Sequence, residues 1–193
     1  MNLDKVHIVD PVSSPQFEDY VNTFYALRKH KNINMNMAND MMQDVSFFGT
    51  MMVYKGHADG MVSGAVNTTQ HTIRPALQFI KTKPGVSVVS SVFFMCLDDR
   101  VSVFGDCAIN PNPNASDLAE FAIESAKAAE MFGITPKVAM LSFSTNGSAK
   151  TEETLKVIEA TKIAQNANSG YEIDGEMQFD AALVDMTGVI EIV

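Results

Sequence analysis

The sequence predicts an α/β fold with a largely parallel sheet. Segments rich in β-branched and aromatic residues alternate with segments whose apolar residues recur at helical spacing, and polar stretches with Gly, Pro and Ser separate them. With 193 residues, 46% of them hydrophobic, the chain is long enough to bury a core as one domain or two small ones. No repeat or low-complexity tract interrupts this alternation.

The first third of the chain begins with helical patterns. Ser14 followed by Pro15 predicts a helix start, and apolar residues then recur at helical spacing up to Leu27. Residues 45–54 read as a second helix, although their methionines and phenylalanines would also suit a buried strand. Residues 58–65 predict a short buried strand, which a polar turn joins to a helix ending near Ile80.

A domain boundary is expected at Lys83-Pro84-Gly85, the strongest break in the middle of the chain. Residues 1–83 would then be part of a first α/β domain, and residues 84–193 a second. In the second, strands at 86–96 and 101–109 predict an antiparallel hairpin. After a polar loop at 110–114, we expect a helix (118–132), a strand (138–143) and a helix (154–165).

Composition excludes several classes of function. The formal net charge of −9, with basic residues dispersed except at positions 28–31, argues against a nucleic-acid surface. Neither a secretory signal nor an apolar run long enough for a membrane span is visible, so a soluble, cytoplasmic protein without a membrane partner is expected. Reduced thiols are expected at Cys96 and Cys107, and no metal site is expected at the cysteines or at His7, His30, His57 and His71.

The first candidate anion site follows the predicted strand at 58–65. Small residues there run into a helix start, where unpaired backbone N–H groups and hydroxyls could hold a phosphate. Because Pro75 is tolerated near the beginning of a helix, Arg74 is expected in the first turn, close to the anion. Alternatively, Arg74 pairs with a surface carboxylate and the glycines only make a turn. The candidate binding residues are Ser63, Gly64, Thr68, Thr69 and Arg74.

The second candidate anion site is the loop at residues 142–150, between a predicted strand and helix. Ligands usually bind at this end of a strand in α/β units. The glycine and lysine spacing does not match a nucleotide-binding P-loop. An ordinary hydroxyl-rich loop with a capping residue is the alternative. The candidate residues are Ser144, Thr145, Gly147, Ser148 and Lys150.

Three further charged residues stand out. Arg28 falls on the apolar side of the first helix, so it either extends outward at the helix end or points into a cleft toward an anion. Asp106 and Asp180 could each act as a general base, and the sequence does not choose between them. Cys107, without a histidine nearby in the sequence, is expected to be an inert thiol.

Ordered sequence runs at these same places resemble the phosphate acetyltransferase family. The resemblance extends from about residue 6 to about residue 184. The matching runs include Tyr25-Ala26-Leu27-Arg28-Lys29-His30-Lys31, Ala58-Asp59-Gly60-Met61-Val62-Ser63-Gly64-Ala65, Thr72-Ile73-Arg74-Pro75-Ala76-Leu77-Gln78, Gly147-Ser148-Ala149-Lys150 and Ile173-Asp174-Gly175-Glu176-Met177-Gln178-Phe179-Asp180.

The resemblance implies a three-layer α/β/α, two-domain fold like that of isocitrate and isopropylmalate dehydrogenases, in a homodimer with the substrate cleft between the domains. It implies transfer of an acetyl group between acetyl phosphate and coenzyme A, with phosphate as the other product and no metal or redox cofactor. The arginines matching Arg28 and Arg74 would bind the substrates, and the loops containing Ser63 and Ser144 would line the cleft.

The resemblance also implies that the family pattern is incomplete at both ends of this sequence. The family's catalytic serine, arginine and aspartate follow the point that matches Ala182, so the catalytic residues are unknown within this chain and little activity is expected from it alone. A phosphate butyryltransferase, a non-catalytic acyl-coenzyme A sensing domain and a fragment without function of its own remain alternatives.

Overall fold

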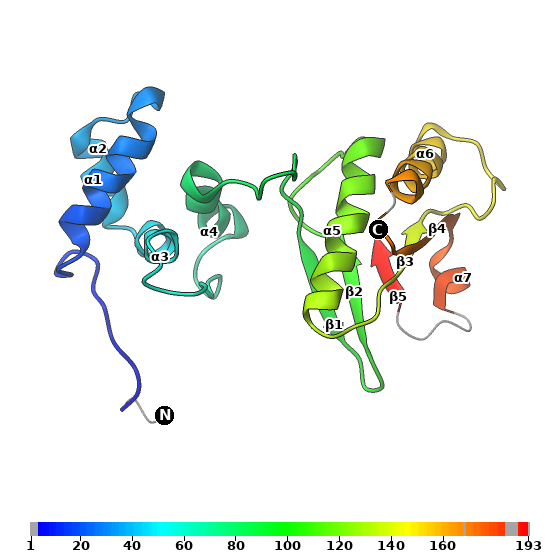
Figure 1. The fold of residues 1–193 in the computed structure, drawn as a ribbon, viewed down its shortest axis with the longest axis horizontal. Coiled ribbons are helices and arrows are strands. Elements are labelled where there is room, and N and C mark those ends of the chain that lie inside the picture. The colour runs from blue at the N-terminus through cyan, green and yellow to red at the C-terminus, as the bar shows by residue number, and fades with distance from the viewer. Residues whose placement is uncertain (1–3, 168, 184–188, 193) are drawn as a thin grey trace. The chain divides into compact units, whose positions relative to one another are not determined.

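The chain forms two compact units, Met1–Lys83 and Pro84–Val193 (Figure 1). The computed structural model describes residues 4–167, 169–183 and 189–192. Each unit has its own cluster of buried apolar residues, and each is described by itself.

Within its described residues, 4–83, the first unit contains helices joined by irregular chain and no strand. Its core is aromatic and methionine-rich: Phe24 is fully buried and packs edge-on against Phe47 and Phe79, with ring centroids 5.7 and 5.6 Å away. The helical segments are α1 (Phe17–Arg28), η1 (Lys29–Lys31), α2 (Met35–Met42), α3 (Val45–Tyr54), α4 (Thr69–Pro75) and η2 (Ala76–Ile80).

Two expectations for this unit are wrong. The strand predicted at residues 58–65 is irregular chain, because Gly64 has a φ of +124° and no strand among residues 4–83 is present to pair with it. The first helix begins at Phe17, after a turn in which Ser14 Oγ accepts a hydrogen bond from the Gln16 N–H, instead of at Pro15. The helical interpretation of residues 45–54 is confirmed by α3.

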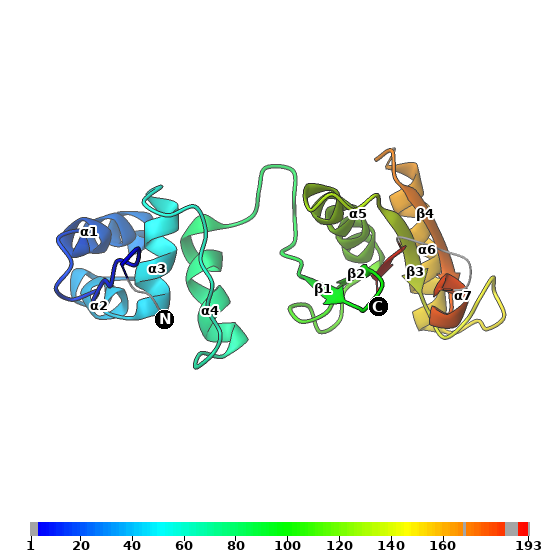
Figure 2. The same cartoon turned by 90° about the horizontal axis from the view of Figure 1, so that it is seen from below.

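The second unit contains a five-stranded sheet in its described part, in the order β1-β2-β5-β3-β4. Figure 2 shows β1 to β4 of this sheet from a second direction. The first two strands form an antiparallel hairpin, and the other neighbouring pairs are parallel. The strands are β1 (Val92–Cys96), β2 (Val101–Gly105), β3 (Lys137–Leu141), β4 (Glu172–Met177) and β5 (Val189–Ile192), and the helices are α5 (Ala115–Met131), α6 (Glu152–Asn166) and α7 (Phe179–Leu183).

Alternate residues of β3 face opposite sides of this sheet. Val138 and Met140 are buried in one cluster with residues of α5 and α6, whereas Ala139 is buried with Ala182 of α7. Side-chain caps start both long helices: Asn114 accepts from the Asp117 N–H at 3.0 Å, and Thr151 accepts from the Thr154 N–H at 3.3 Å.

The described part of the second unit has the α/β character that the sequence predicts, with two differences. The hairpin strands are shorter than expected, and the sequence patterns do not predict β4, α7 or β5. Beyond residue 184, where the stretch that resembles the family ends, residues 189–192 form β5 between β2 and β3; residues 185–188 and 193 lie outside the described part. No described helix is sufficiently long and apolar to cross a membrane.

Candidate functional site

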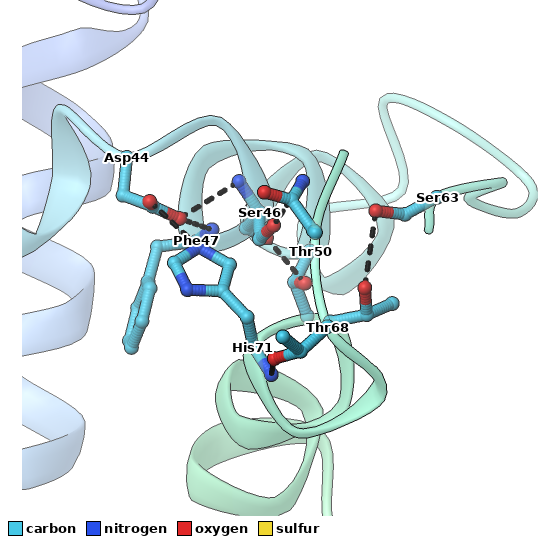
Figure 3. Close-up of polar contacts among 9 residues, drawn as sticks. Asp44, Ser46, Phe47, Thr50, Ser63, Thr68 and His71 are labelled. Carbon is cyan, nitrogen blue, oxygen red and sulfur yellow. Dashed lines mark hydrogen bonds and ion pairs between the residues drawn. The ribbon is translucent and has the colours of Figure 1, made fainter. Parts of the chain in front are cut away.

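The first candidate loop leads from the end of α3 into α4 and carries exposed hydroxyls (Figure 3). Ser63 Oγ lies 3.2 Å from Thr72 Oγ1, one turn inside α4. Thr68 caps α4, because its Oγ1 accepts a hydrogen bond from the His71 N–H at 3.2 Å. Thr69, the first residue of α4, and Gly64 are also exposed, so the sequence-predicted residues of this loop lie at the surface of the unit.

Asp44 occupies the start of the neighbouring helix α3. Its Oδ1 accepts hydrogen bonds from the N–H groups of Ser46 and Phe47 at 2.9 and 3.1 Å, and its Oδ2 accepts from His71 Nε2 at 2.8 Å (Figure 3). At the start of α4, where the sequence predicts unpaired N–H groups, the Thr68 cap already occupies the His71 N–H. What the loop offers to a ligand is its hydroxyls and a cavity of about 420 Å³, lined by Ser46, Gly49 and residues 61–67, among others.

The two arginines of this unit have different environments. Arg28, the last residue of α1, is half-buried: its Nη1 donates to the Gln78 carbonyl at 3.2 Å, while its Nε is buried without a hydrogen-bond partner. Arg74 is exposed and lies in the last turn of α4, not the first, because the Thr68 cap starts that helix at Thr69. Gln78 follows Arg74 by one helical turn. That both guanidinium groups serve one anion remains a prediction.

The second candidate loop connects β3 to α6 and closes on a buried carboxylate. Glu176, on β4, is only 4% exposed. Its Oε1 accepts hydrogen bonds from the Gly147 N–H at 2.6 Å and from Ser144 Oγ at 3.2 Å. Ser144 itself is fully buried, and its Oγ also lies 3.0 Å from Ser148 Oγ and accepts from the Ala149 N–H at 3.0 Å.

These contacts give the second loop a structural role. The Gly147 N–H and the Ser144 hydroxyl, which could have held a phosphate, are bonded to a carboxylate supplied by the protein itself. Thr145 Oγ1 accepts from the Gln178 N–H at 2.9 Å, which ties the loop to the end of β4 a second time. Gly147, Ser148 and Lys150 are exposed and form the outer side of the loop.

Sequence reasoning did not find Glu176. It occurs in the run at 173–182 that resembles the family, but it lies 29 residues from Gly147 and 32 from Ser144 along the chain. Nothing in local spacing connects groups so far apart. The only signal was an acidic residue within an extended segment that also holds buried apolar positions such as Ile173.

The two candidate bases differ in environment. Asp106, directly after β2, has one buried oxygen, Oδ1, without a hydrogen-bond partner; burial raises the pKa of this carboxyl group, and attraction to Lys156 partly opposes the rise. Asp180 is exposed, and its Oδ1 accepts from the Ala181 N–H at 3.0 Å. Cys107 Sγ lies 3.3 Å from Ser91 Oγ. Among the described residues, no cluster of three or more His, Cys, Asp or Glu side chains could hold a metal ion.

Comparison with known proteins places the chain in a family. The family model described as phosphate acetyl/butaryl transferase matches residues 1–188. The chain is 58% identical over 183 residues to a phosphate acetyltransferase of Nitratidesulfovibrio vulgaris, covering 95% of this chain and 26% of that protein. It is 49% identical over 183 residues to a phosphate acetyltransferase of Corynebacterium glutamicum, covering 95% of this chain and 56% of that protein.

A solved structure resembles the whole chain. A phosphotransacetylase from Staphylococcus aureus superposes with a TM-score of 0.86 and 44% identity, covering 100% of this chain and 63% of that one. The chain therefore spans between about a quarter and somewhat over half of the two curated relatives. From the match across nearly all of its residues, the chain belongs to the phosphate acetyl/butaryl transferase family.

Proposed function

We propose that this chain is part of a phosphate acetyltransferase, which transfers an acetyl group reversibly between acetyl phosphate and coenzyme A. The observation that carries the proposal is the 58% identity over 183 residues to a relative named phosphate acetyltransferase. The exposed hydroxyls and the two arginines of the first unit supply groups suited to a phosphate substrate.

Arg28 is a candidate for holding a phosphate through its Nη groups. One of its five N–H donors is used on the Gln78 carbonyl, which fixes the guanidinium, and its Nε–H has no partner. Arg74, exposed one turn before Gln78, would add a second positive charge. The hydroxyls of Ser63, Thr68 and Thr69 would bind phosphate oxygens, whereas the loop containing Ser144, Thr145, Gly147, Ser148 and Lys150 would contribute through its outer side.

The proposed reaction is direct attack of a thiolate on the acetyl carbonyl. A carbon–sulfur bond forms as the bond from that carbon to the phosphate oxygen breaks, and phosphate leaves. Arginine donors would neutralise the departing phosphate, and oriented hydrogen bonds would stabilise the developing oxyanion. The coenzyme A thiol has a pKa of about 8.5, so it is mostly protonated at neutral pH and requires a positioned base.

The broader setting is part of the same proposal. The two units would be portions of two α/β domains with the three-layer arrangement of the isocitrate and isopropylmalate dehydrogenases. The protein would act in the cytoplasm as a homodimer, with coenzyme A, acetyl phosphate and phosphate as its small-molecule partners and no metal or redox cofactor. The similarity of this chain to a solved phosphotransacetylase, at a TM-score of 0.86, supports this setting.

Isothermal titration of the chain with coenzyme A and with acetyl phosphate tests the proposal. Both compounds should bind. Arg74→Gln should lower the affinity for acetyl phosphate by about tenfold, because one charge-assisted contact is lost. Arg100→Gln is the matched control, because Arg100 lies in the turn of the hairpin, where it pairs with Asp99 at 3.4 Å. No measurable binding of either compound, or equal effects of the two substitutions, would contradict the proposal.

The acyl group is the remaining choice, since the description of the family names both acetyl and butaryl transferase. The names of the two relatives favour acetyl. Titration with butyryl phosphate beside acetyl phosphate distinguishes them, with tighter binding of acetyl phosphate as the expected result.

A further inference from the structure

A second cavity, of about 310 Å³, lies at the carboxyl edge of the sheet in the second unit. Strands β2 and β3 both pair in parallel with β5, so their carboxyl ends reach the same edge. Asp106 follows β2 there, and Ser142 and Phe143 follow β3. Ligands of open α/β sheets bind at this edge, yet the acyl-transfer proposal above assigns the cavity no role.

Asp106 is the unusual residue of this cavity. Its φ is +54°, a left-handed conformation that non-glycine residues seldom adopt. Its buried Oδ1 has no hydrogen-bond partner, although buried polar atoms are nearly always paired. Of the four such unpaired side-chain atoms in the described residues, this is the one that belongs to a residue lining the cavity. Strain together with an unpaired acceptor is typical of a place where a ligand completes the contacts.

The rest of the lining indicates what kind of ligand would fit. Lys156, on α6, supplies a donor to the same cavity as the Asp106 acceptor. With Glu153 also in the lining, the charged side chains sum to −1, which disfavours a phosphate or carboxylate. Most of the other walls are apolar, including Pro111, Leu141 and Val157. Such a cavity suits a largely apolar, uncharged group that presents an N–H donor beside an acceptor.

We propose that this cavity binds an uncharged part of coenzyme A, whose N–H group donates to the Asp106 carboxylate while a neighbouring acceptor receives a hydrogen bond from Lys156 Nζ. The inference rests on the proposed function for the identity of the ligand. Coenzyme A has two parts with this chemistry: the amides of its pantetheine arm and the amino edge of its adenine ring. Neither part carries the phosphate charges that the cavity disfavours.

The test uses pantetheine and adenosine as separate uncharged probes of the isotope-labelled 193-residue chain, with amide chemical shifts as the readout. One of the two probes should cause saturable shifts at residues of the cavity lining, and the responding probe identifies the part of coenzyme A. Asp106→Ala should weaken that binding by about tenfold, as expected for loss of a hydrogen bond to a charged group. Glu159→Ala, on the exposed side of α6, is the matched control and should have no effect.

A second variant keeps the test independent of folding defects. Lys156→Met preserves much of the apolar stem and removes only the donor, so it should also weaken the binding of the probe that responds. Absence of shifts in the lining with both probes, or binding unchanged by both substitutions, overturns the inference. If coenzyme A binds while the lining does not respond, the cavity assignment fails and the proposed function stands. If neither coenzyme A nor acetyl phosphate binds, the proposed function fails, and the inference that this cavity holds part of coenzyme A fails with it.

Discussion

Two loops with similar composition behave in opposite ways in this molecule. Residues 58–69 and 142–150 are both rich in Ser, Thr and Gly, and both precede a helix. In the first, Ser63 and Thr68 are exposed, and the Ser63 hydroxyl contacts one neighbouring hydroxyl at 3.2 Å. In the second, Ser144 is fully buried and contacts a second hydroxyl, a carboxylate and a backbone N–H.

A single carboxylate accounts for much of this difference. Glu176 accepts hydrogen bonds from the Gly147 N–H and the Ser144 hydroxyl, two donors that an anionic ligand could otherwise use. The carboxylate that borders the first loop, Asp44, is used on the start of α3 and on His71, so the loop hydroxyls stay open. A hydroxyl-rich loop is thus available to a ligand only where the protein does not supply its own anion.

The largest expected effect comes from the glycine beside Glu176. A Cβ on Gly175 would lie 2.6 Å from both Cβ and the carbonyl oxygen of Met140, and the φ of this residue is +148°. Gly175→Ala should therefore lower the free energy of unfolding of the second unit by roughly 3–5 kcal/mol, from overpacking and backbone strain together. Urea denaturation combined with amide hydrogen exchange in β3 measures this loss in the free energy of unfolding.

Gly64 provides the matched control in the open loop. Its φ is +124°, but nothing lies within 4 Å of an added Cβ. Gly64→Ala should cost only roughly 1–2 kcal/mol, from backbone strain alone. Equal losses in the two variants would mean that the contact of an added Cβ at Gly175 with Met140 costs nothing beyond backbone strain.

The carboxylate itself should have the next largest effect. Glu176→Ala leaves the Gly147 N–H and the Ser144 hydroxyl without their acceptor at a nearly buried site, which should cost roughly 2–4 kcal/mol. Glu176→Gln keeps an acceptor oxygen and should cost about 1 kcal/mol. Hydrogen exchange of the Gly147 amide should accelerate strongly in the alanine variant and weakly in the glutamine variant. A glutamine variant as damaged as the alanine variant would show that the charge, not the acceptor, holds the loop.

A more exposed carboxylate, that of Glu120, shows how burial changes the contribution of a hydrogen-bonded carboxylate to stability. Glu120 accepts from Ser87 Oγ at 2.5 Å and from the N–H groups of Ser87 and Val88 at 2.6 and 3.2 Å. Burial raises its pKa, but hydrogen bonds from Ser87 and Val88 outweigh this, and the pKa is lowered from its ordinary value of 4.5. The resulting stability is fully present above pH 4.5 and is lost as the pH falls through the lowered pKa.

Because Glu120 is partly exposed to solvent, this pH-dependent contribution should stay below about 1 kcal/mol. Unfolding free energies measured between about pH 6 and pH 3 for the parent chain and for Glu120→Gln should converge at the acidic end, since the substitution removes the titrating group. Parallel curves over that range would contradict a role for Glu120 ionisation.

The sequence predicts the parts of this molecule that local patterns determine. Residues 45–54, with their continuous apolar composition, form α3, and α5 and α6 lie where periodicity placed them. The strand at 58–65 fails because strand formation needs a partner, which is a property of the fold and not of the segment. The internal caps at Asp44 and Thr68, and the contacts of Glu176, depend on residues brought together in space, so candidate loops could be named from the sequence but their accessibility could not.

The smallest effect on stability, and the one that bears most directly on ligand access, is expected at Ser63. Ser63→Ala should change the free energy of unfolding by less than about 0.5 kcal/mol, because the residue is exposed, but it should weaken inorganic phosphate binding. Ser148→Ala should act mainly on stability: Ser148 Oγ accepts from the Thr145 N–H at 3.2 Å and contacts Ser144, so its loss should cost about 1 kcal/mol and lower phosphate affinity less than Ser63→Ala does. Phosphorus NMR titrations of both variants measure affinity, and urea denaturation measures stability. If Ser148→Ala lowers the affinity for phosphate and Ser63→Ala does not, the second loop is the one open to the ligand. Glu176 would then hold this loop in a shape that binds the anion, instead of taking the anion's place.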